Sequence, residues 1–225
     1  MKKLLISIAA WLAFMVQAYA GGSVGVTLTA ASIDTALKDD IDSNGTTNTT
    51  KNISNDIAYG SLFAEMTSDT NASGLSLTVG VDYIPFEAEF DSRSTTQSSL
   101  KAKGDGAATS GTNKGTVDVK NHATLYVQPA KDLGNGLSVF ATAGFAMADV
   151  DMIVQSVSST NKTVTETLEG TKLGIGVKKD LGGTFVKLEY SETDYDTLSV
   201  TTSNNTKVSG DMDNNALNLS FGKSF

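Results

Sequence analysis

The chain ends in Leu217-Asn218-Leu219-Ser220-Phe221-Gly222-Lys223-Ser224-Phe225, and this stretch decides the fold. Leucine, phenylalanine and the long lysine side chain occupy every second position, and glycine or small polar residues fill the positions between them. A period of two is typical of a β-strand with one apolar face and one small polar face. The sequence therefore predicts a strand that ends in an aromatic residue at the terminal carboxylate.

Seven further segments with the same alternation precede this strand. They cover residues 23–30, 57–66, 75–83, 117–128, 137–147, 172–178 and 185–191. No long helical pattern interrupts them. The segments predict an all-β fold of eight antiparallel strands in up-and-down order.

Short and long connections alternate between the segments. The short ones are residues 68–74, 131–136 and 179–183, and the long ones are residues 35–56, 87–116, 149–167 and 194–214. Each short connection ends in glycine, which adopts a positive φ at little cost. The long ones are rich in Ser, Thr, Asn, Asp and Gly, yet parts of them still alternate. We therefore expect some strands to continue into them as hairpins.

The first 20 residues have the pattern of a targeting segment. Lys2 and Lys3 give a positive start, residues 4–16 are apolar, and Ala18-Tyr19-Ala20 is a small-residue cleavage pattern. The apolar stretch is too short to span a bilayer as a helix. We predict a cleaved signal peptide at residues 1–20 and one domain at residues 21–225.

Composition narrows the classes of function. Loss of Lys2 and Lys3 would take the formal charge from −8 to −10, and so acidic a chain argues against nucleic acid as a partner. The chain has no cysteine, so an exported form would have no disulfides. Its stability would then come from a closed hydrogen-bond network or a core.

A membrane barrel explains the two faces better than a soluble sandwich does. A sandwich can carry long charged groups on its water-facing side, whereas Gly, Ser, Thr and Ala dominate the polar face here. Small residues suit the interior of an eight-stranded barrel, which side chains just fill. Lipid also requires every backbone group to be paired, and strands achieve this only by closing into a ring. Outer-membrane barrels have short periplasmic turns and longer extracellular loops, so the four long connections would face outward.

Charged side chains also fall on the predicted inner face. They are the acidic residues Glu65, Asp82, Asp118 and Glu189 and the basic residues Lys120, Lys172, Lys178 and Lys187. An unpaired charge in a confined interior is strongly destabilising, so we expect a network of ion pairs that plugs the lumen. The alternative is that several of these charges lie at the rims in water. His122, the only histidine, shares this face and is expected to satisfy hydrogen bonds, since no G-x-S-x-G nucleophile motif accompanies it.

Asp40, Asp42 and Asn44, followed by Gly45, match the opening of a calcium-binding loop. Lys51 stands where that loop needs a bidentate glutamate, and no helices are predicted on either side. A solvated turn is therefore the preferred interpretation. Calcium stays a weak candidate, and no cofactor is expected.

The strand count, the turn asymmetry and the C-terminal residues Leu217, Leu219, Phe221 and Phe225 together resemble a known group of proteins. They are the small eight-stranded outer-membrane proteins of Gram-negative bacteria, the OmpA membrane-domain, OmpX and opacity-protein group. The resemblance implies export to the periplasm and insertion into the outer membrane, among lipid and lipopolysaccharide. It also implies that the outer-membrane assembly machinery reads the four C-terminal residues.

Members of that group serve variously as envelope structural proteins, adhesins, evasion factors or narrow pores, so the fold gives little guidance about function. We expect a non-enzymatic scaffold whose polar extracellular loops contact host, cell-surface or phage ligands. A narrow, porin-like channel for small solutes is one alternative. A lipid-modifying enzyme that uses His122 or a loop carboxylate is the other.

Overall fold

The computed structural model describes residues 21–40, 49–86, 88–100, 109–156, 159–201 and 207–225, which form one antiparallel sheet. Its strands are β1 (Gly21–Asp40), β2 (Thr49–Thr67), β3 (Leu75–Tyr83), β4 (Ala88–Leu100), β5 (Thr109–Gly134), β6 (Leu137–Ser156), β7 (Ser159–Asp180), β8 (Thr184–Thr201) and β9 (Lys207–Ser224). None of the described residues belongs to a helix long and apolar enough to cross a bilayer.

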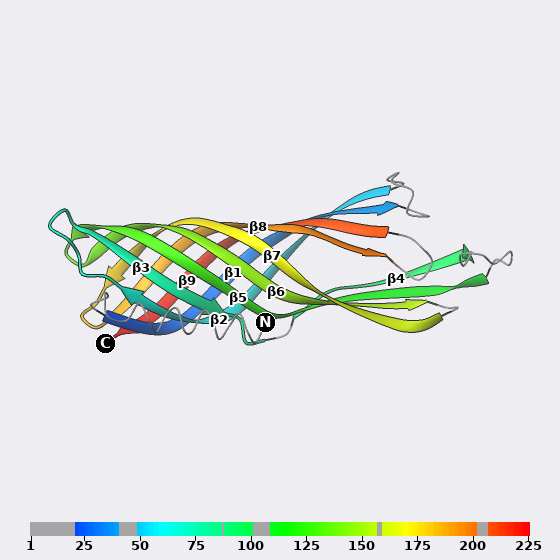
Figure 1. The fold of residues 1–225 in the computed structure, drawn as a ribbon, viewed down its shortest axis with the longest axis horizontal. Coiled ribbons are helices and arrows are strands. Elements are labelled where there is room, and N and C mark those ends of the chain that lie inside the picture. Colours follow the sequence, from blue (N-terminus) through cyan, green and yellow to red (C-terminus); the bar gives the residue numbers. More distant parts are fainter. Residues whose placement is uncertain (1–20, 41–48, 87, 101–108, 157–158, 202–206) are drawn as a thin grey trace.

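Eight of these strands close into a ring (Figure 1). Their order is β3-β2-β1-β9-β8-β7-β6-β5, and β5 pairs in turn with β3. The first and last strands are joined along their length, from Ser23 opposite Ser224 to Asp40 opposite Lys207. The predicted eight-stranded antiparallel up-and-down barrel is confirmed.

β4 is the outer half of the third barrel strand. β3 pairs with residues 123–131 of β5, and β4 pairs with the earlier part of the same strand, from Val119 to Thr109. Pro85 lies between the two halves, and it has no N–H to donate to a strand ladder. The ladder stops at Ile84, whose N–H donates to the carbonyl of His122 at 2.9 Å.

The three short connections are tight turns at one end of the barrel, called here the turn end. Gly74, Gly136 and Gly183 have φ values of 73°, 71° and 92°, the conformation predicted for the glycine that ends each turn. Aspartates stabilise two of the turns. The carboxylates of Asp132 and Asp180 each accept the backbone N–H two residues further on, at 2.8 and 2.7 Å.

At the opposite end the long connections are mostly strand. β1, β2, β8 and β9 continue beyond the ring as a four-stranded extension, the first paddle, and β4, β5, β6 and β7 continue as the second paddle (Figure 1). The paddles separate where β2–β3 pairing stops at Leu62 opposite Tyr83 and where β7–β8 pairing stops at Gly170 opposite Tyr195. The expected continuation of strands as hairpins is confirmed.

Candidate functional site

Aromatic rings that lie over glycines of the neighbouring strands occupy part of the lumen. Five inward-facing rings are each directly opposite a glycine of the neighbouring strand, in the pairs Phe63–Gly25, Tyr126–Gly80, Phe140–Gly176, Phe185–Gly222 and Tyr195–Gly170. A Cβ atom added to any of these glycines would clash with the opposite ring. The rings therefore occupy the space that the glycines leave, and the interior becomes dense although its sequence is rich in small residues.

A buried ion pair crosses the lumen on top of these rings. Lys187 Nζ donates to Glu65 Oε1, and both side chains are almost fully buried. Glu65 also accepts hydrogen bonds from the Tyr126 hydroxyl at 2.7 Å and the Ser23 hydroxyl at 3.4 Å. The Lys187 ammonium lies 4.8 Å from the centroid of the Phe63 ring, within range of a cation–π interaction. Glu65 and Lys187 therefore form a buried ion pair within the lumen, called here the ionic layer.

Other predicted inner charges lie near this layer. Lys172 Nζ is 3.4 Å from Glu189 Oε1, an electrostatic contact whose geometry does not make a hydrogen bond, because that oxygen has no hydrogen-bond partner among the described residues. Asp82 accepts a hydrogen bond from the Ser61 hydroxyl at 2.7 Å. Lys178 lies nearer the turn end, with its ammonium 4.1 Å from the centroid of the Phe185 ring.

The structure does not bring Asp118 and Lys120 into this network. β5 carries one extra residue between Lys120 and Ala123 relative to β6, and Asn121 there has a φ of 54°. Such a β-bulge reverses which face each side chain points to. Beyond it, Val119 packs against the buried inner cluster, so its neighbours Asp118 and Lys120 point to the outer face.

Lys120 instead anchors the outer face of the second paddle. Its ammonium is 2.5 Å from Asp151 Oδ2, and the Thr165 hydroxyl donates to the other carboxylate oxygen at 2.7 Å. These hydrogen bonds hold the pKa of Asp151 below its usual range. The first paddle has a matching arrangement, in which Thr197 and Lys38 donate to Asp211 and lower the pKa of its carboxyl.

His122 lies inside the barrel, on the paddle side of the ionic layer. Its Nε2 is 2.8 Å from the Tyr195 hydroxyl, and its Nδ1 is buried with no hydrogen-bond partner among the described residues. The contact that the structure gives to this histidine is with a tyrosine and not with a serine nucleophile. The hydrogen bonding expected of His122 is therefore found at Nε2 and not at Nδ1.

Cavities lie on both sides of the ionic layer. A vestibule of about 440 Å³ at the turn end includes Asp132, Lys178 and Asp180 in its wall. A polar cavity of about 40 Å³ lies next to Asp82, Lys172 and Glu189 in the middle of the barrel. An apolar cavity of about 260 Å³ follows at the paddle end. Lys187 lines both the vestibule and the polar cavity, so the ionic layer lies between these two cavities.

The calcium candidate begins at Asp40, the last described residue of β1. Asp42 and Asn44 lie outside the described residues, as does the side chain of Asp40. The described residues contain no group of three or more His, Cys, Asp or Glu side chains placed to hold a metal ion. The calcium interpretation therefore stays a prediction.

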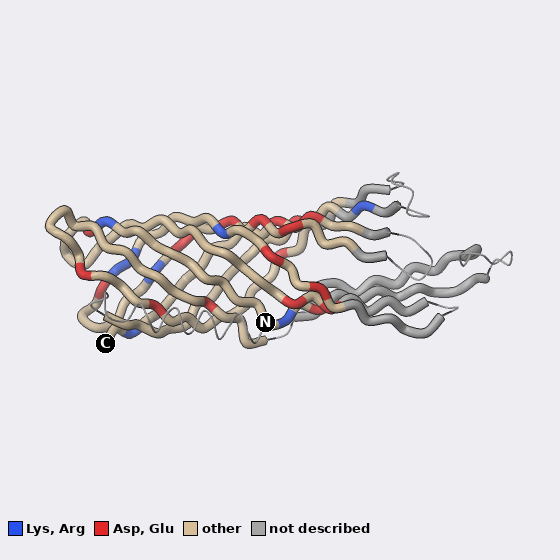
Figure 2. The backbone as a smooth tube through the Cα atoms, viewed as in Figure 1, with Lys and Arg blue, Asp and Glu red and all other residues tan. Residues whose placement is uncertain are grey.

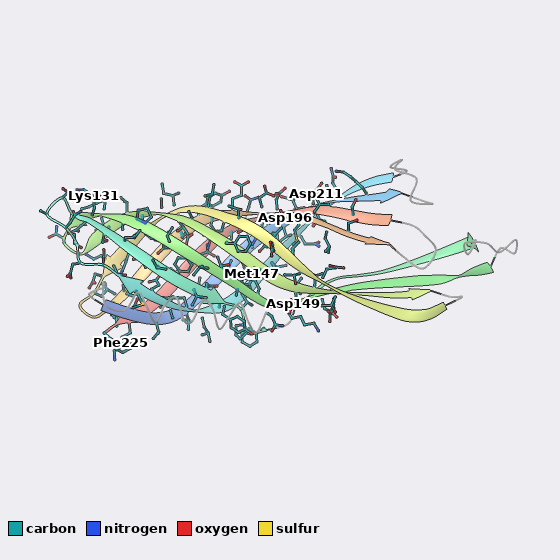
Figure 3. The ribbon with its side chains drawn as sticks, in the orientation of Figure 1. Lys131, Met147, Asp149, Asp196, Asp211 and Phe225 are labelled. Atoms are coloured by element: carbon teal, nitrogen blue, oxygen red, sulfur yellow. The ribbon has the colours of Figure 1, made fainter. Side chains whose placement is uncertain are left out.

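The outer face of the ring is a continuous apolar belt. Its exposed residues include Val26, Leu28, Leu62, Leu77, Tyr83, Val139, Phe145, Leu173, Ile175, Leu188, Tyr190, Leu217, Leu219 and Phe221. Phe225 is 74% exposed, and Figure 3 shows it near the turn end. Large exposed apolar surface on every strand of a closed ring suits contact with lipid tails. The four residues of the predicted assembly signal, Leu217, Leu219, Phe221 and Phe225, all face this side.

Acidic residues mark the boundary of the belt on the paddle side. Figure 2 shows Asp and Glu concentrated where the ring gives way to the paddles, and Figure 3 places Asp149, Asp196 and Asp211 at this level. Charges that begin where the apolar belt stops are expected at a membrane interface. The chain resembles the small eight-stranded outer-membrane barrels.

Among known proteins the chain has only distant likenesses. No family model and no curated protein sequence matches the chain. It is similar in structure to Ail, the attachment invasion locus protein of Yersinia pestis, at 10% identity over 92% of this chain and 100% of that chain, with a TM-score of 0.40. It is also similar to Neisserial surface protein A, at 9% identity over 88% of this chain and 97% of that chain, with a TM-score of 0.36. A third similar structure is the outer membrane protease OmpT of Escherichia coli, at 8% identity over 91% of this chain and 97% of that chain, with a TM-score of 0.43. These likenesses are too distant to carry an argument about function.

Sequence reasoning placed Glu65, Asp82, His122, Lys172, Lys178, Lys187 and Glu189 on the inner face, and they line its cavities. It did not single out the five inward aromatic rings. Their signal is an aromatic residue on a face otherwise made of small residues. That signal predicts a packed lumen only once the strand register is known, because the register sets each ring opposite a glycine.

Proposed function

We propose that this protein is a non-enzymatic outer-membrane barrel with a plugged lumen, whose function is recognition by its two extracellular paddles. The observation that carries the proposal is the ionic layer of Glu65 and Lys187, packed among aromatic rings. A barrel filled in this way serves as a rigid support. The surface available for recognition is then the pair of four-stranded paddles, since binding function usually resides on segments that a rigid scaffold presents.

The same proposal includes the cellular location of the protein. A signal peptide at residues 1–20 would direct export, and the assembly machinery of a Gram-negative outer membrane would read the C-terminal strand. The apolar belt would then contact outer-membrane lipid and lipopolysaccharide. Host, cell-surface or phage ligands would meet the paddles, and neither cofactor nor nucleic acid is expected as a partner.

Conductance across a planar bilayer tests the plugged lumen. The folded barrel is expected to give no steady pore current, because the buried ion pair and the aromatic rings beside it would obstruct the passage of water and ions. Large, steady currents from the monomer would contradict the plug and favour the narrow-channel alternative. A catalytic role would need a nucleophile beside His122, and the described contact of that histidine is with Tyr195.

Shortened paddles test the recognition role. One variant replaces residues 39–49 and 200–208 with two-residue Asn-Gly turns, which trims the first paddle at paired positions. The matched variant replaces residues 92–116 and 153–163, which trims the second. Cells that display each form would be tested on immobilised host glycoproteins and glycosaminoglycans. Loss of adhesion with one trimmed paddle is expected, and equal adhesion by the full barrel and both trimmed forms would refute the proposal.

A further inference from the structure

The apolar cavity at the paddle end of the lumen has the properties of a binding site. Its volume is about 260 Å³. Its apolar wall is built from Ile33, Ile57, Val119, Ala148, Leu168 and Met212. Some of these residues belong to or pack against the buried cluster of Ala146, Val150, Leu168 and Tyr195, so the wall is supported from behind. A cavity of about 150 Å³ with such a lining holds a benzene molecule, so this one has room for a larger body.

Two polar atoms without partners belong to residues at the floor of this cavity, where it adjoins the polar cavity in the middle of the barrel. His122 and Asn214 line the cavity, and both His122 Nδ1 and Asn214 Oδ1 are buried with no hydrogen-bond partner among the described residues. Asn214 is only 8% exposed. Buried polar atoms are nearly always paired, because an unpaired one is destabilising. Two such atoms in one cavity indicate groups that a ligand would satisfy.

The hydrogen-bonding pattern of the floor selects the polar group of that ligand. Asn214 Oδ1 can only accept, so the ligand must donate a hydrogen there. His122 Nε2 contacts the Tyr195 hydroxyl, and when the tyrosine donates, Nδ1 of a neutral imidazole carries a hydrogen to donate. A hydroxyl group donates and accepts at once, and so matches both atoms.

The wall of the barrel is open beside the cavity. β2 pairs with β3 only up to Leu62 opposite Tyr83, and beyond that point this edge of β2 has no strand partner within the described part of the chain. Ala58 of β2, with Ile84 and Phe86 on the other side of the gap, also line the cavity. Phe86 lines the cavity and is 68% exposed, so the lining of the cavity reaches the protein surface on this side.

We propose that this cavity binds a small uncharged amphiphile, with a hydrocarbon body and one hydroxyl group, which enters between β2 and β3. The body lies against Leu168 and Met212, and the hydroxyl bonds to Asn214 and His122. By volume the site accommodates a fused two-ring aromatic alcohol of about ten to twelve heavy atoms. This activity is separate from recognition by the paddles, so either can be tested without the other.

Equilibrium dialysis of 2-naphthol against the barrel in lipid nanodiscs tests the proposal, with empty nanodiscs to subtract partition into lipid. We expect one saturable site per barrel. The matched probe 2-methylnaphthalene has a similar size and no hydroxyl, and is expected to bind about tenfold more weakly. Absence of saturable 2-naphthol binding, or equal affinity for the two probes, would overturn the proposal.

Variants locate the site. Asn214→Ala and His122→Phe remove one partner each, and should weaken 2-naphthol about tenfold while changing 2-methylnaphthalene less than twofold. Ala148→Phe fills the cavity and should abolish binding of both probes, and Met212→Trp fills it from another strand should the first variant not fold. Gln128→Ala is the matched control and should bind both probes normally, because Gln128 accepts a hydrogen bond from Lys187 at 3.4 Å and does not line the cavity. Binding that persists in a folded, filled variant would place the probe elsewhere and refute the site.

Discussion

Replacement of Lys187 by methionine would leave a carboxylate buried without its counter-charge. The Glu65 side chain is 1% exposed, and without Lys187 it keeps only the hydroxyls of Tyr126 and Ser23 as partners. Breaking a buried ion pair by removal of one partner typically costs about 3–5 kcal/mol. We expect Lys187→Met to lower the free energy of unfolding by that amount.

The double variant Glu65→Leu/Lys187→Met separates the ion pair from the packing around it. Removal of both charges also removes the burial penalty of each, so most of the loss should be recovered. The Tyr126 hydroxyl would then lack its acceptor, which costs about 1–3 kcal/mol. The double variant is therefore expected to lose about 1–3 kcal/mol, which is less than the loss of the single variant Lys187→Met.

Urea unfolding in lipid vesicles, followed by loss of strand circular dichroism, measures these free energies. Tryptophan fluorescence cannot report on the barrel, because the only tryptophan, Trp11, lies in the predicted signal peptide. Lys38→Met is the matched control, since its ion pair with Asp211 is 46% exposed on both sides and should contribute about 0–1 kcal/mol. A loss for Lys187→Met no greater than that of Lys38→Met would refute the ionic layer as a structural element.

Three other predictions concern the rings, the belt and the paddles. Gly222→Ala places a methyl group into the Phe185 ring and should destabilise the barrel by about 1–3 kcal/mol, whereas Gly60→Ala, whose Cβ meets only ordinary contacts, should be nearly neutral in the same urea assay. Ile175→Arg puts a charge on the lipid-facing belt and should cost about 2–4 kcal/mol in vesicles, with Ile175→Val as the neutral control. The pKa of Asp151 is depressed in the folded chain, so its contribution to stability is present above the ordinary aspartate pKa and is lost as the pH falls through the lowered value. Protection of the β6 and β7 amides against hydrogen exchange, taken relative to the intrinsic exchange rate at each pH, should therefore fall only in acid below pH about 4. The fall should be smaller in Thr165→Val, which lacks one of the two donors, and equal protection at pH 7 and in acid in the native chain would contradict the assignment.

Alternation along the chain is strong enough to predict the ring and its two faces. The apolar positions of β9 and the glycine at the end of each short turn needed no tertiary information, because the strand period and positive φ are local properties. The inner position of Glu65, Lys187 and Glu189 followed from the same alternation of inward and outward side chains along each strand. The long connections were harder, because their polar composition resembles loop sequence although strand pairing continues through them.

Alternation along β5 predicted the wrong face of the sheet for Asp118 and Lys120. A single extra residue in β5 is enough to reverse the face of every side chain beyond it. Asparagine tolerates the left-handed φ seen at Asn121 better than most residues, yet the sequence offers many asparagines that do not form bulges. The site of the bulge depends on how β5 pairs with β6, and that information lies in neither strand alone.

Register also decides whether the lumen is open or filled. An inner face of small residues, taken by itself, would suit a water-filled tube as well as a plugged one. The five aromatic rings change this, because each lies across a glycine on the next strand, and a shift of one of these strands by a single residue would set its ring against a side chain or on the wrong face. Four of these rings, those of Phe63, Tyr126, Phe140 and Phe185, lie around the Lys187 ammonium, which is buried with its partner Glu65. Strand register, aromatic packing and the ion pair therefore depend on one another, and a change that opens the lumen should also destabilise the barrel.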